Sequence, residues 1–319
     1  MTAPVAVTGS TGFIGTHLVE RLAADGVPVR ALVRSPERMA PELRARVDVV
    51  VGTLEEPEVL RRLVAGTGTV IHLAALASAW TRHTDDFFTI NVEGTRRVLA
   101  AAREEGVGRV VYVSTVLTRF PLEEAPTPYL ASKHMAERLV HRYVAAGGDA
   151  VIVQPCRVYG PGPLNDANGA TKLLDTYLHG PLCVRLRDGG VRASWVHVHD
   201  VVQGILLAGR RGDPGESYVL GAENASVAEL LELAGELAGV RRRCLAIPPG
   251  PALFVAALFE LGGRLGLPVL ITRSWVRSFL RDQTVDIEPT GQALDYHPRP
   301  LRDGLAPTIA WLRSRRRGD

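Results

Sequence analysis

Tyr129 and Lys133 carry the clearest chemistry in the sequence. They lie four positions apart at the start of a helical pattern, so both side chains share one face of the expected helix. An ammonium held near a phenol favours the phenolate and lowers a pKa that is ordinarily about 10. The chain has only two lysines, so the pairing is not expected by chance. We predict that Tyr129 donates or accepts a proton and that Lys133 tunes it.

Two further hydroxyl groups, those of Ser114 and Thr115, follow a predicted strand over residues 109–113. In open α/β folds, ligands bind beyond the carboxyl ends of the strands. We therefore expect one of these two hydroxyls to lie beside Tyr129 and to hold a substrate oxygen.

Gly9, Gly12 and Gly15 follow the first predicted strand and open the first predicted helix. The first permits a tight turn, the second lets the backbone approach a pyrophosphate, and the third lets helix and strand pack closely. The helix N-terminus then faces the anion. This turn predicts a dinucleotide site, to which the intervening and following residues also belong: Thr11, Phe13 and Ile14.

The residue after the second predicted strand is Arg34. A dinucleotide without a 2′-phosphate is usually held here by an acidic residue that accepts from the ribose hydroxyls. A guanidinium instead suits the additional phosphate of NADP. We predict that Arg34, with Ser35 and Arg38, makes the protein prefer NADP(H) over NAD(H).

Strand and helix patterns alternate through the first half of the chain. β-Branched runs predict strands at residues 5–8, 29–33, 47–51, 69–73, 109–113 and 150–153. Helical patterns between them cover residues 13–24, 57–64, 85–105 and 129–146. This alternation predicts a doubly wound parallel α/β sheet of the Rossmann type.

The rhythm changes after Pro155, where Gly-Pro pairs interrupt the chain. We place a dinucleotide-binding domain at residues 1–160 and a smaller substrate lobe at 161–319, with some segments returning to the main sheet. A strand near 218–220 is the candidate for such a return. Helices are expected in this lobe at residues 198–208, 227–235, 253–261, 272–279 and 306–313.

Composition excludes several classes of protein. The chain has 319 residues, 46% of them hydrophobic, and a net charge of +3 with no basic stripe that would track nucleic acid. Its three cysteines show neither a disulfide framework nor zinc-ligand spacing, and no other metal site is indicated. The N-terminus does not resemble a signal peptide, and the longest apolar run, residues 251–259, is too short to span a bilayer. We expect a cytoplasmic protein without a membrane partner.

The order of these motifs resembles the extended short-chain dehydrogenase/reductase family, which includes NAD-dependent epimerases and dehydratases. The resemblance covers essentially the whole chain. It rests on the glycine turn, the Ser114-Thr115 pair, the Tyr129-xxx-Lys133 pair and four further segments at residues 72–75, 91–95, 155–160 and 196–200.

The resemblance implies a role for each motif. Tyr129 would be the general acid or base, Lys133 would bind the nicotinamide ribose, and Thr115 would hold the reacting oxygen, with Ser114 as the alternative. Asn91 would position loops or a proton-relay water. The remaining implied cofactor contacts are Leu54, Leu73, Ala74, Ala75, Pro155 and Val158. Members of the family commonly pair, so we expect a homodimer.

Departures from the family pattern narrow the reaction. Dehydratases of the family have Thr-Asp-Glu where this chain has Thr-Val-Leu at 115–117, which disfavours elimination of water. Arg192 lies near the position that holds a diphosphate in sugar-nucleotide enzymes, although one residue out of register. The segment from residue 268 onward resembles the flavonol-reductase and 3β-hydroxysteroid dehydrogenase branches, which act on apolar ring-bearing ketones and alcohols.

Three hypotheses follow. The first is an NADPH-dependent ketoreductase acting on an apolar ring-bearing or keto-sugar substrate, with Tyr129 as proton donor. The second is an NAD-dependent sugar-nucleotide 4-epimerase or 4-ketoreductase that uses the same residues and Arg192. The third, a dinucleotide sensor without catalysis, is disfavoured by the Tyr-xxx-Lys pair.

Overall fold

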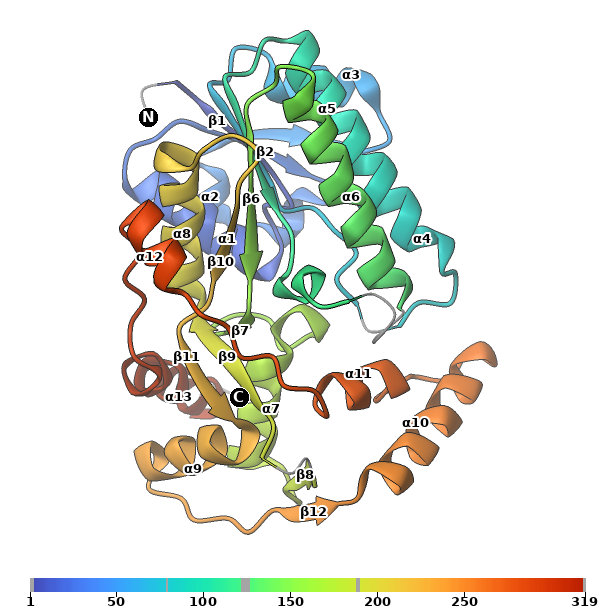
Figure 1. The fold of residues 1–319 in the computed structure, drawn as a ribbon. Coiled ribbons are helices and arrows are strands. Elements are labelled where there is room, and N and C mark those ends of the chain that lie inside the picture. Colours follow the sequence, from blue (N-terminus) through green and yellow to red (C-terminus); the bar gives the residue numbers. More distant parts are fainter. Residues whose placement is uncertain (1–2, 79, 122–126, 188–189, 318–319) are drawn as a thin grey trace.

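A seven-stranded parallel sheet forms the centre of the molecule (Figure 1). The structure, a computed structural model, describes residues 3–78, 80–121, 127–187 and 190–317. The strand order across the sheet is β10-β6-β5-β4-β1-β2-β3. Successive strands are added on one side of β1 up to β3 and on its other side from β4 onward. Doubly wound folds bind their ligands at this switch point between β1 and β4. The strands are β1 (Val5–Thr8), β2 (Val29–Val33), β3 (Asp48–Val51), β4 (Thr69–His72), β5 (Arg109–Val113), β6 (Ala150–Pro155) and β10 (Ser217–Leu220). The predicted Rossmann fold is confirmed.

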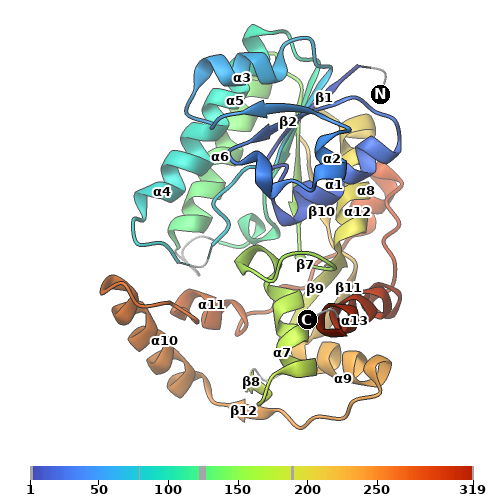
Figure 2. The same ribbon diagram turned by 180° about the vertical axis from the view of Figure 1, so that it is seen from behind.

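Helices cover both faces of this sheet (Figures 1 and 2). One face carries α1 (Phe13–Ala24) and α8 (Val198–Arg211), and the other carries α3 (Pro57–Val64), α5 (Gly94–Glu104) and α6 (Pro128–Ala145). Three short elements lie beside this sheet. They are η1 (Pro36–Arg38), α2 (Pro41–Arg44) and α12 (Glu288–Leu294), and α12 packs against α8 and β10. Because both faces are covered, β1, β4 and β6 are buried along their whole length.

Two segments of the second half belong to this sheet. Strand β10 pairs in parallel with β6, which confirms that the region of 218–220 returns to the main sheet. The expected helix at 198–208 was assigned to the small lobe, and that assignment was wrong. Helix α8 packs on the central sheet through Val201, Val202 and Ile205, because this apolar stripe fits between α1 and the strands.

The helix expected at 85–105 is divided into three parts. They are α4 (Asp85–Phe88), a π-helical turn at Thr89–Glu93 and α5. A π-helical turn inside a helix frequently marks a functional position, and this one contains Asn91.

The remaining elements form the small lobe, around a core cluster that includes Leu174, Trp195 and Leu305. Strand β9 pairs antiparallel with β11 and parallel with β7. The elements are β7 (Arg157–Tyr159), η5 (Asp166–Asn168), α7 (Gly169–His179), β8 (Val184–Leu186), β9 (Arg192–His197), β11 (Glu223–Ser226), α9 (Val227–Ala238), β12 (Leu245–Ile247), α10 (Pro249–Arg264), α11 (Arg273–Ser278) and α13 (Leu301–Arg317). None of the helices described in this structure is long and apolar enough to cross a membrane.

Cys183 and Cys244 form a disulfide, which corrects the expectation that the cysteines would not pair. The pairing follows from the strands that come next. Val184 of β8 is the register partner of Leu245 of β12, so the two preceding cysteines lie side by side, with their Cα atoms 4.5 Å apart. A separation of 61 residues in the sequence gave no sign of this contact.

Candidate active site

The turn between β1 and α1 has the shape of a phosphate cradle. Gly9 has a φ of +71°, and a Cβ there would lie 2.7 Å from the backbone nitrogen of Ala74. A Cβ on Gly15 would collide with the Gly9 carbonyl oxygen. Gly12 occupies the N-cap position of α1 and has no side chain that could accept from the first amides of the helix. These amides are therefore available to an anion. These residues fit a dinucleotide pyrophosphate.

A buried network fixes the strands around this turn. His72 at the end of β4 lies 2.6 Å from the Thr8 hydroxyl and 3.0 Å from that of Thr95 on α5. The backbone amide of Ala74 donates to the same Thr8 hydroxyl at 3.2 Å. Burial lowers the pKa of His72 to about 3, so the ring is neutral. His72 therefore serves to position the segment that lines the cofactor site.

Arg34 directly follows β2, the neighbour of β1, and its side chain is exposed. Ser35 caps the short helix η1, which contains the exposed Arg38. The carboxyl ends of β1 and β2 meet at one edge of the sheet. Arg34 therefore lies at the same edge of the sheet as the glycine turn, with Arg38 four residues further along the chain.

The other predicted cofactor residues surround the same edge. Leu54 follows β3 and packs against Gly94 at the start of α5. Phe13 and Pro155 are buried, and half-buried positions at this edge are Thr11, Ile14, Leu73, Ala74, Ala75 and Val158.

Tyr129 lies in the first turn of α6, directly after Pro128, and Thr127 caps this helix. The phenol of Tyr129 shares a hydrogen bond with the hydroxyl of Thr115, which follows β5. Burial raises the pKa of Tyr129 to about 12, while the hydrogen bond to Thr115 acts in the opposite direction. The pKa is thus raised by burial, which corrects the expectation that Lys133 would lower it. The phenol is protonated at neutral pH, in the form that donates a proton.

Ser114 precedes Thr115 and is almost fully buried, at 8% exposure. Its hydroxyl has no hydrogen-bond partner among the described residues. A buried polar atom without a partner costs free energy, so such an atom beside Thr115 is suited to meet a ligand.

Lys133 lies one helical turn after Tyr129 and is buried. Its Nζ donates to the carbonyl of Val113 in β5 at 2.9 Å and lies 4.4 Å from the ring centre of Tyr112. Burial lowers the pKa of Lys133 to about 7, and the charge of Glu137 opposes this shift. Lys133 is thus held between the sheet and α6, near the balance of its two protonation states.

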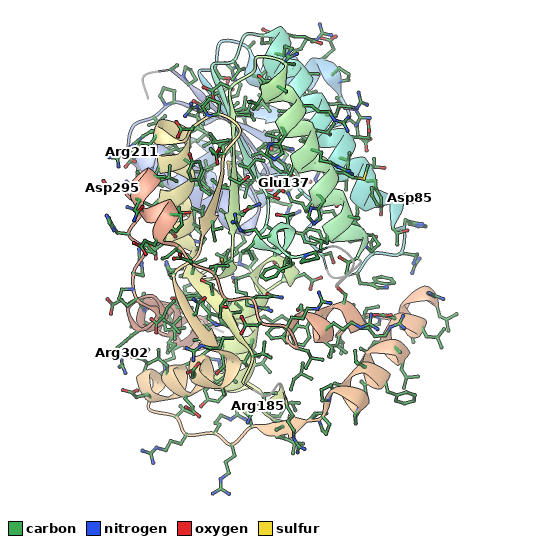
Figure 3. The ribbon with its side chains drawn as sticks, viewed as in Figure 1. Asp85, Glu137, Arg185, Arg211, Asp295 and Arg302 are labelled. Atoms are coloured by element: carbon green, nitrogen blue, oxygen red, sulfur yellow. A yellow bond between two sulfur atoms is a disulfide. The ribbon has the colours of Figure 1, made fainter. Side chains whose placement is uncertain are left out.

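Glu137 is a residue that the sequence analysis missed. It lies one turn beyond Lys133 and accepts hydrogen bonds from Thr118 at 2.8 Å and from Gln154 of β6 at 3.0 Å. Figure 3 labels Glu137 where α6 approaches the sheet. The spacing of Lys133 and Glu137 was the available signal, because side chains four apart share a helix face.

Asn91 joins the loop after β4 to helix α6. Its side-chain oxygen accepts from the amide of Leu76 at 2.7 Å, and its Nδ2 donates to Ser132 at 2.9 Å. Ser132 lies between Tyr129 and Lys133 in the sequence. Asn91 therefore holds the start of α6 against the cofactor-lining loop.

Arg192 lies apart from this cluster, at the first residue of β9. It is exposed, forms an ion pair with Glu229 at 3.0 Å and donates to the carbonyl of Asn224 at 2.6 Å. These contacts tie β9 to β11 and α9. In the described structure Arg192 is engaged within the small lobe.

An apolar cavity of about 250 Å³ lies in the small lobe. Its lining includes Leu186, Ile247, Ile271, Trp275 and Phe279. The ring of Phe279 stacks 4.1 Å from the guanidinium of Arg157, in β7 just beyond Pro155. Phe279 of the cavity lining therefore contacts a residue two positions beyond the end of β6.

The sheet, the glycine turn and the Ser-Thr, Tyr and Lys positions define an NAD(P)-dependent oxidoreductase of the extended short-chain dehydrogenase/reductase type. The family described as "NAD dependent epimerase/dehydratase family" matches residues 5–221. The chain belongs to this family.

Several curated proteins to which the chain is similar are named as reductases. A putative dihydroflavonol 4-reductase of Synechocystis is 28% identical, over 97% of this chain and 94% of its own length. A 4-hydroxy-2-methyl-3-oxo-4-farnesyl-3,4-dihydroquinoline-1-oxide ketoreductase of Stigmatella aurantiaca is 38% identical, over 67% of this chain and 66% of its own length. A ceramide reductase of Caulobacter vibrioides is 31% identical, over 97% and 94%.

A solved structure extends the comparison to bound molecules. The structure of MoeE5 in complex with UDP-glucuronic acid and NAD has a TM-score of 0.78 and 27% sequence identity, over 98% of this chain and 99% of that one. The protein is thus an NAD(P)-dependent enzyme similar to ketoreductases and to sugar-nucleotide enzymes.

Proposed function

We propose that the protein reduces a ketone on an apolar small molecule with NADPH. The observation that carries the proposal is the protonated Tyr129 phenol, hydrogen-bonded to Thr115 with buried Lys133 one turn away. A bound NADPH supplies the hydride that reaches the carbonyl carbon. Thr115 holds the carbonyl oxygen, and Tyr129 gives it the proton that completes the alcohol. Lys133 stabilises the phenolate that remains until solvent returns the proton.

The preference for NADPH rests on Arg34, Ser35 and Arg38. Two exposed guanidinium groups at the end of β2 suit a phosphate monoester, and no carboxylate follows this strand directly to accept from a free ribose diol. The assignments of the catalytic and cofactor residues belong to this proposal, as does the expected homodimer.

The apolar nature of the substrate rests on the cavity in the small lobe, whose lining residue Phe279 stacks on Arg157 just beyond the end of β6. Its lining suits an alkyl, prenyl or ring system. The names of the Stigmatella and Caulobacter relatives include a farnesyl group and a ceramide. The diphosphate of a sugar nucleotide is a less suitable ligand, because Arg192, the residue expected to bind it, already contacts Glu229 and Asn224.

The test is a substrate panel assayed for consumption of NADPH by the purified protein. We expect turnover with long-chain or polycyclic ketones and little with a nucleotide-linked 4-keto sugar. Turnover of the keto sugar alone would contradict the apolar substrate. Conversion of a UDP-hexose to its 4-epimer without net use of cofactor would replace the proposal by the epimerase hypothesis.

A further inference from the structure

Helix α10 has an unusual distribution of side chains. Its buried positions are Ala252, Ala256 and Gly263. A Cβ on Gly263 would lie 2.8 Å from the Trp80 ring, so this small-residue face packs closely on the body of the protein. In a surface helix of a soluble protein the larger apolar side chains usually face the core, and here the arrangement is reversed.

The outward face of α10 and the segment after it are apolar. Phe254, Leu258, Leu261 and Leu265 recur at helical spacing and are 66%, 53%, 56% and 80% exposed. Leu267 and Leu270 continue the surface at 62% and 71%. Ten of the twelve large apolar side chains that are exposed in the described part of the chain lie between residues 182 and 270. We call the exposed apolar residues of 254–270 the α10 surface.

The α10 surface is continuous with the apolar cavity. Val255 is both 44% exposed on α10 and part of the cavity lining, as is Val184 at 40% exposure on β8. Ile271 lines the cavity directly after Leu270. Figures 1 and 2 place α10 at the outer edge of the molecule, with α11 on its inner side. An apolar ligand can thus pass from the surface to the cavity along apolar side chains.

The sequence on either side of the α10 surface is strongly positive. Residues 239–281 contain seven arginines and a single acidic residue, Glu260. Glu260 is paired with Arg273 at 2.7 Å. Among the arginines, Arg241, Arg243, Arg264 and Arg277 are exposed. Exposed apolar side chains flanked by arginines are the pattern of a segment that lies in the interface of an anionic bilayer.

We propose that the α10 surface docks on an anionic lipid bilayer and that apolar substrates enter the cavity from it. The helix lies on the membrane and does not cross it, so the proposal revises only the expectation that the protein has no membrane partner. The docking is independent of the reaction, whereas the delivery of substrate rests on the proposed function.

The test is co-sedimentation of the full chain with vesicles of phosphatidylglycerol and phosphatidylcholine, and with phosphatidylcholine alone, at low salt and without substrate. We expect binding to the anionic vesicles. Leu258→Ser with Leu261→Ser should weaken it by roughly tenfold or more, because two leucines no longer enter the acyl region. Val51→Ser with Met135→Ser, two exposed apolar positions elsewhere, is the matched control and should bind as the natural chain does.

A second variant tests the charge. Arg264→Glu should weaken binding to anionic vesicles and leave any binding to phosphatidylcholine alone unchanged. Circular dichroism and NADPH binding establish that each variant is folded. A natural chain that stays in the supernatant overturns the docking, as does equal binding by the leucine variant. Light scattering tests whether a second copy of the chain covers the α10 surface instead. A dimer that is dissociated by Leu258→Ser with Leu261→Ser would show this and would overturn the docking.

The readout does not depend on turnover. Docking that persists in a protein inactive toward every ketone refutes the proposed function and leaves the membrane surface standing. Turnover of soluble short-chain ketones by a chain that never binds vesicles refutes only the docking.

Discussion

Helices α6 and α10 distribute their side chains in opposite ways. Helix α6 buries the charged Lys133 and Glu137 against the central sheet, whereas α10 buries alanine and glycine and exposes Phe254 and Leu258. A buried charge is retained where it acts on another group, and in the proposed reaction that group is the Tyr129 phenol. An exposed apolar face is retained where it meets an apolar partner. The proposed function and the proposed docking surface therefore place the reaction and the entry of substrate in different lobes.

The largest effect should come from the proton donor on α6. Tyr129→Phe removes the phenolic proton and should lower kcat by about a thousandfold, while NADPH binds as before. Tyr143→Phe on the same helix, far from the site, is the control and should retain activity. Stopped-flow absorbance of NADPH measures both. Full turnover by Tyr129→Phe would show that α6 does not supply the proton.

The next effect separates the two hydroxyls beside β5. Thr115→Val should lower kcat by roughly a hundredfold, because it removes the group that holds the developing oxyanion. Ser114→Ala should lower kcat less, since Thr115 hydrogen-bonds the Tyr129 phenol. Steady-state kinetics of the two variants give the order. The reverse order would transfer the oxyanion role to Ser114.

A smaller effect is expected at the cofactor end of the same sheet. Arg34→Asp removes charge-assisted hydrogen bonds to the 2′-phosphate. It should weaken the binding of NADPH by roughly tenfold to a hundredfold and strengthen the binding of NADH. Fluorescence titration measures the ratio of the two dissociation constants. Arg44→Asp on α2, also exposed, is the control. An unchanged ratio in Arg34→Asp would mean that Arg34 does not contact the phosphate.

The smallest effect concerns the charge pair of α6. The rate should fall as pH rises through the pKa of Lys133, about 7, because the lysine then loses the charge that supports the phenolate. Glu137 raises that pKa, so Glu137→Gln should lower it and move the alkaline fall to lower pH. If the pKa falls by about one unit, from about 7 to about 6, the charged fraction of Lys133 at pH 7 falls by roughly fivefold, and we expect the rate to fall by the same factor.

The exposed Glu104→Gln is the matched control and should leave the pH profile of kcat/KM in place. A shift in the pH profile is a readout that a purely structural role of Glu137 would not produce. An unmoved profile in Glu137→Gln would show that Glu137 only holds Thr118 and Gln154.

The sheet was predictable because its strands are continuous apolar runs and its helices have the right length to cross it. The Tyr129 and Lys133 positions were predictable because their chemistry depends on spacing along one helix. Glu137 was missed, since its partners Thr118 and Gln154 come from other elements. The disulfide was missed for the same reason, because it depends on the pairing of β8 with β12.

Helix α8 shows a related limit. Its apolar stripe predicts a helix with one buried face, but the pattern does not say which sheet covers that face. The apolar run at 251–259 was also visible in the sequence. Only the structure shows that its large side chains point outward, which distinguishes α10 from an ordinary core helix.

The central claim is net reduction with NADPH at the Tyr129 site. The most direct test is to identify the dinucleotide released from the purified protein, measure its occupancy, and titrate the protein with NADPH and NADH. We expect low occupancy and preferential, reversible binding of NADPH. Stoichiometric NAD that survives purification would contradict this expectation, because an enzyme that retains its own NAD regenerates the cofactor within each turnover, as an epimerase does.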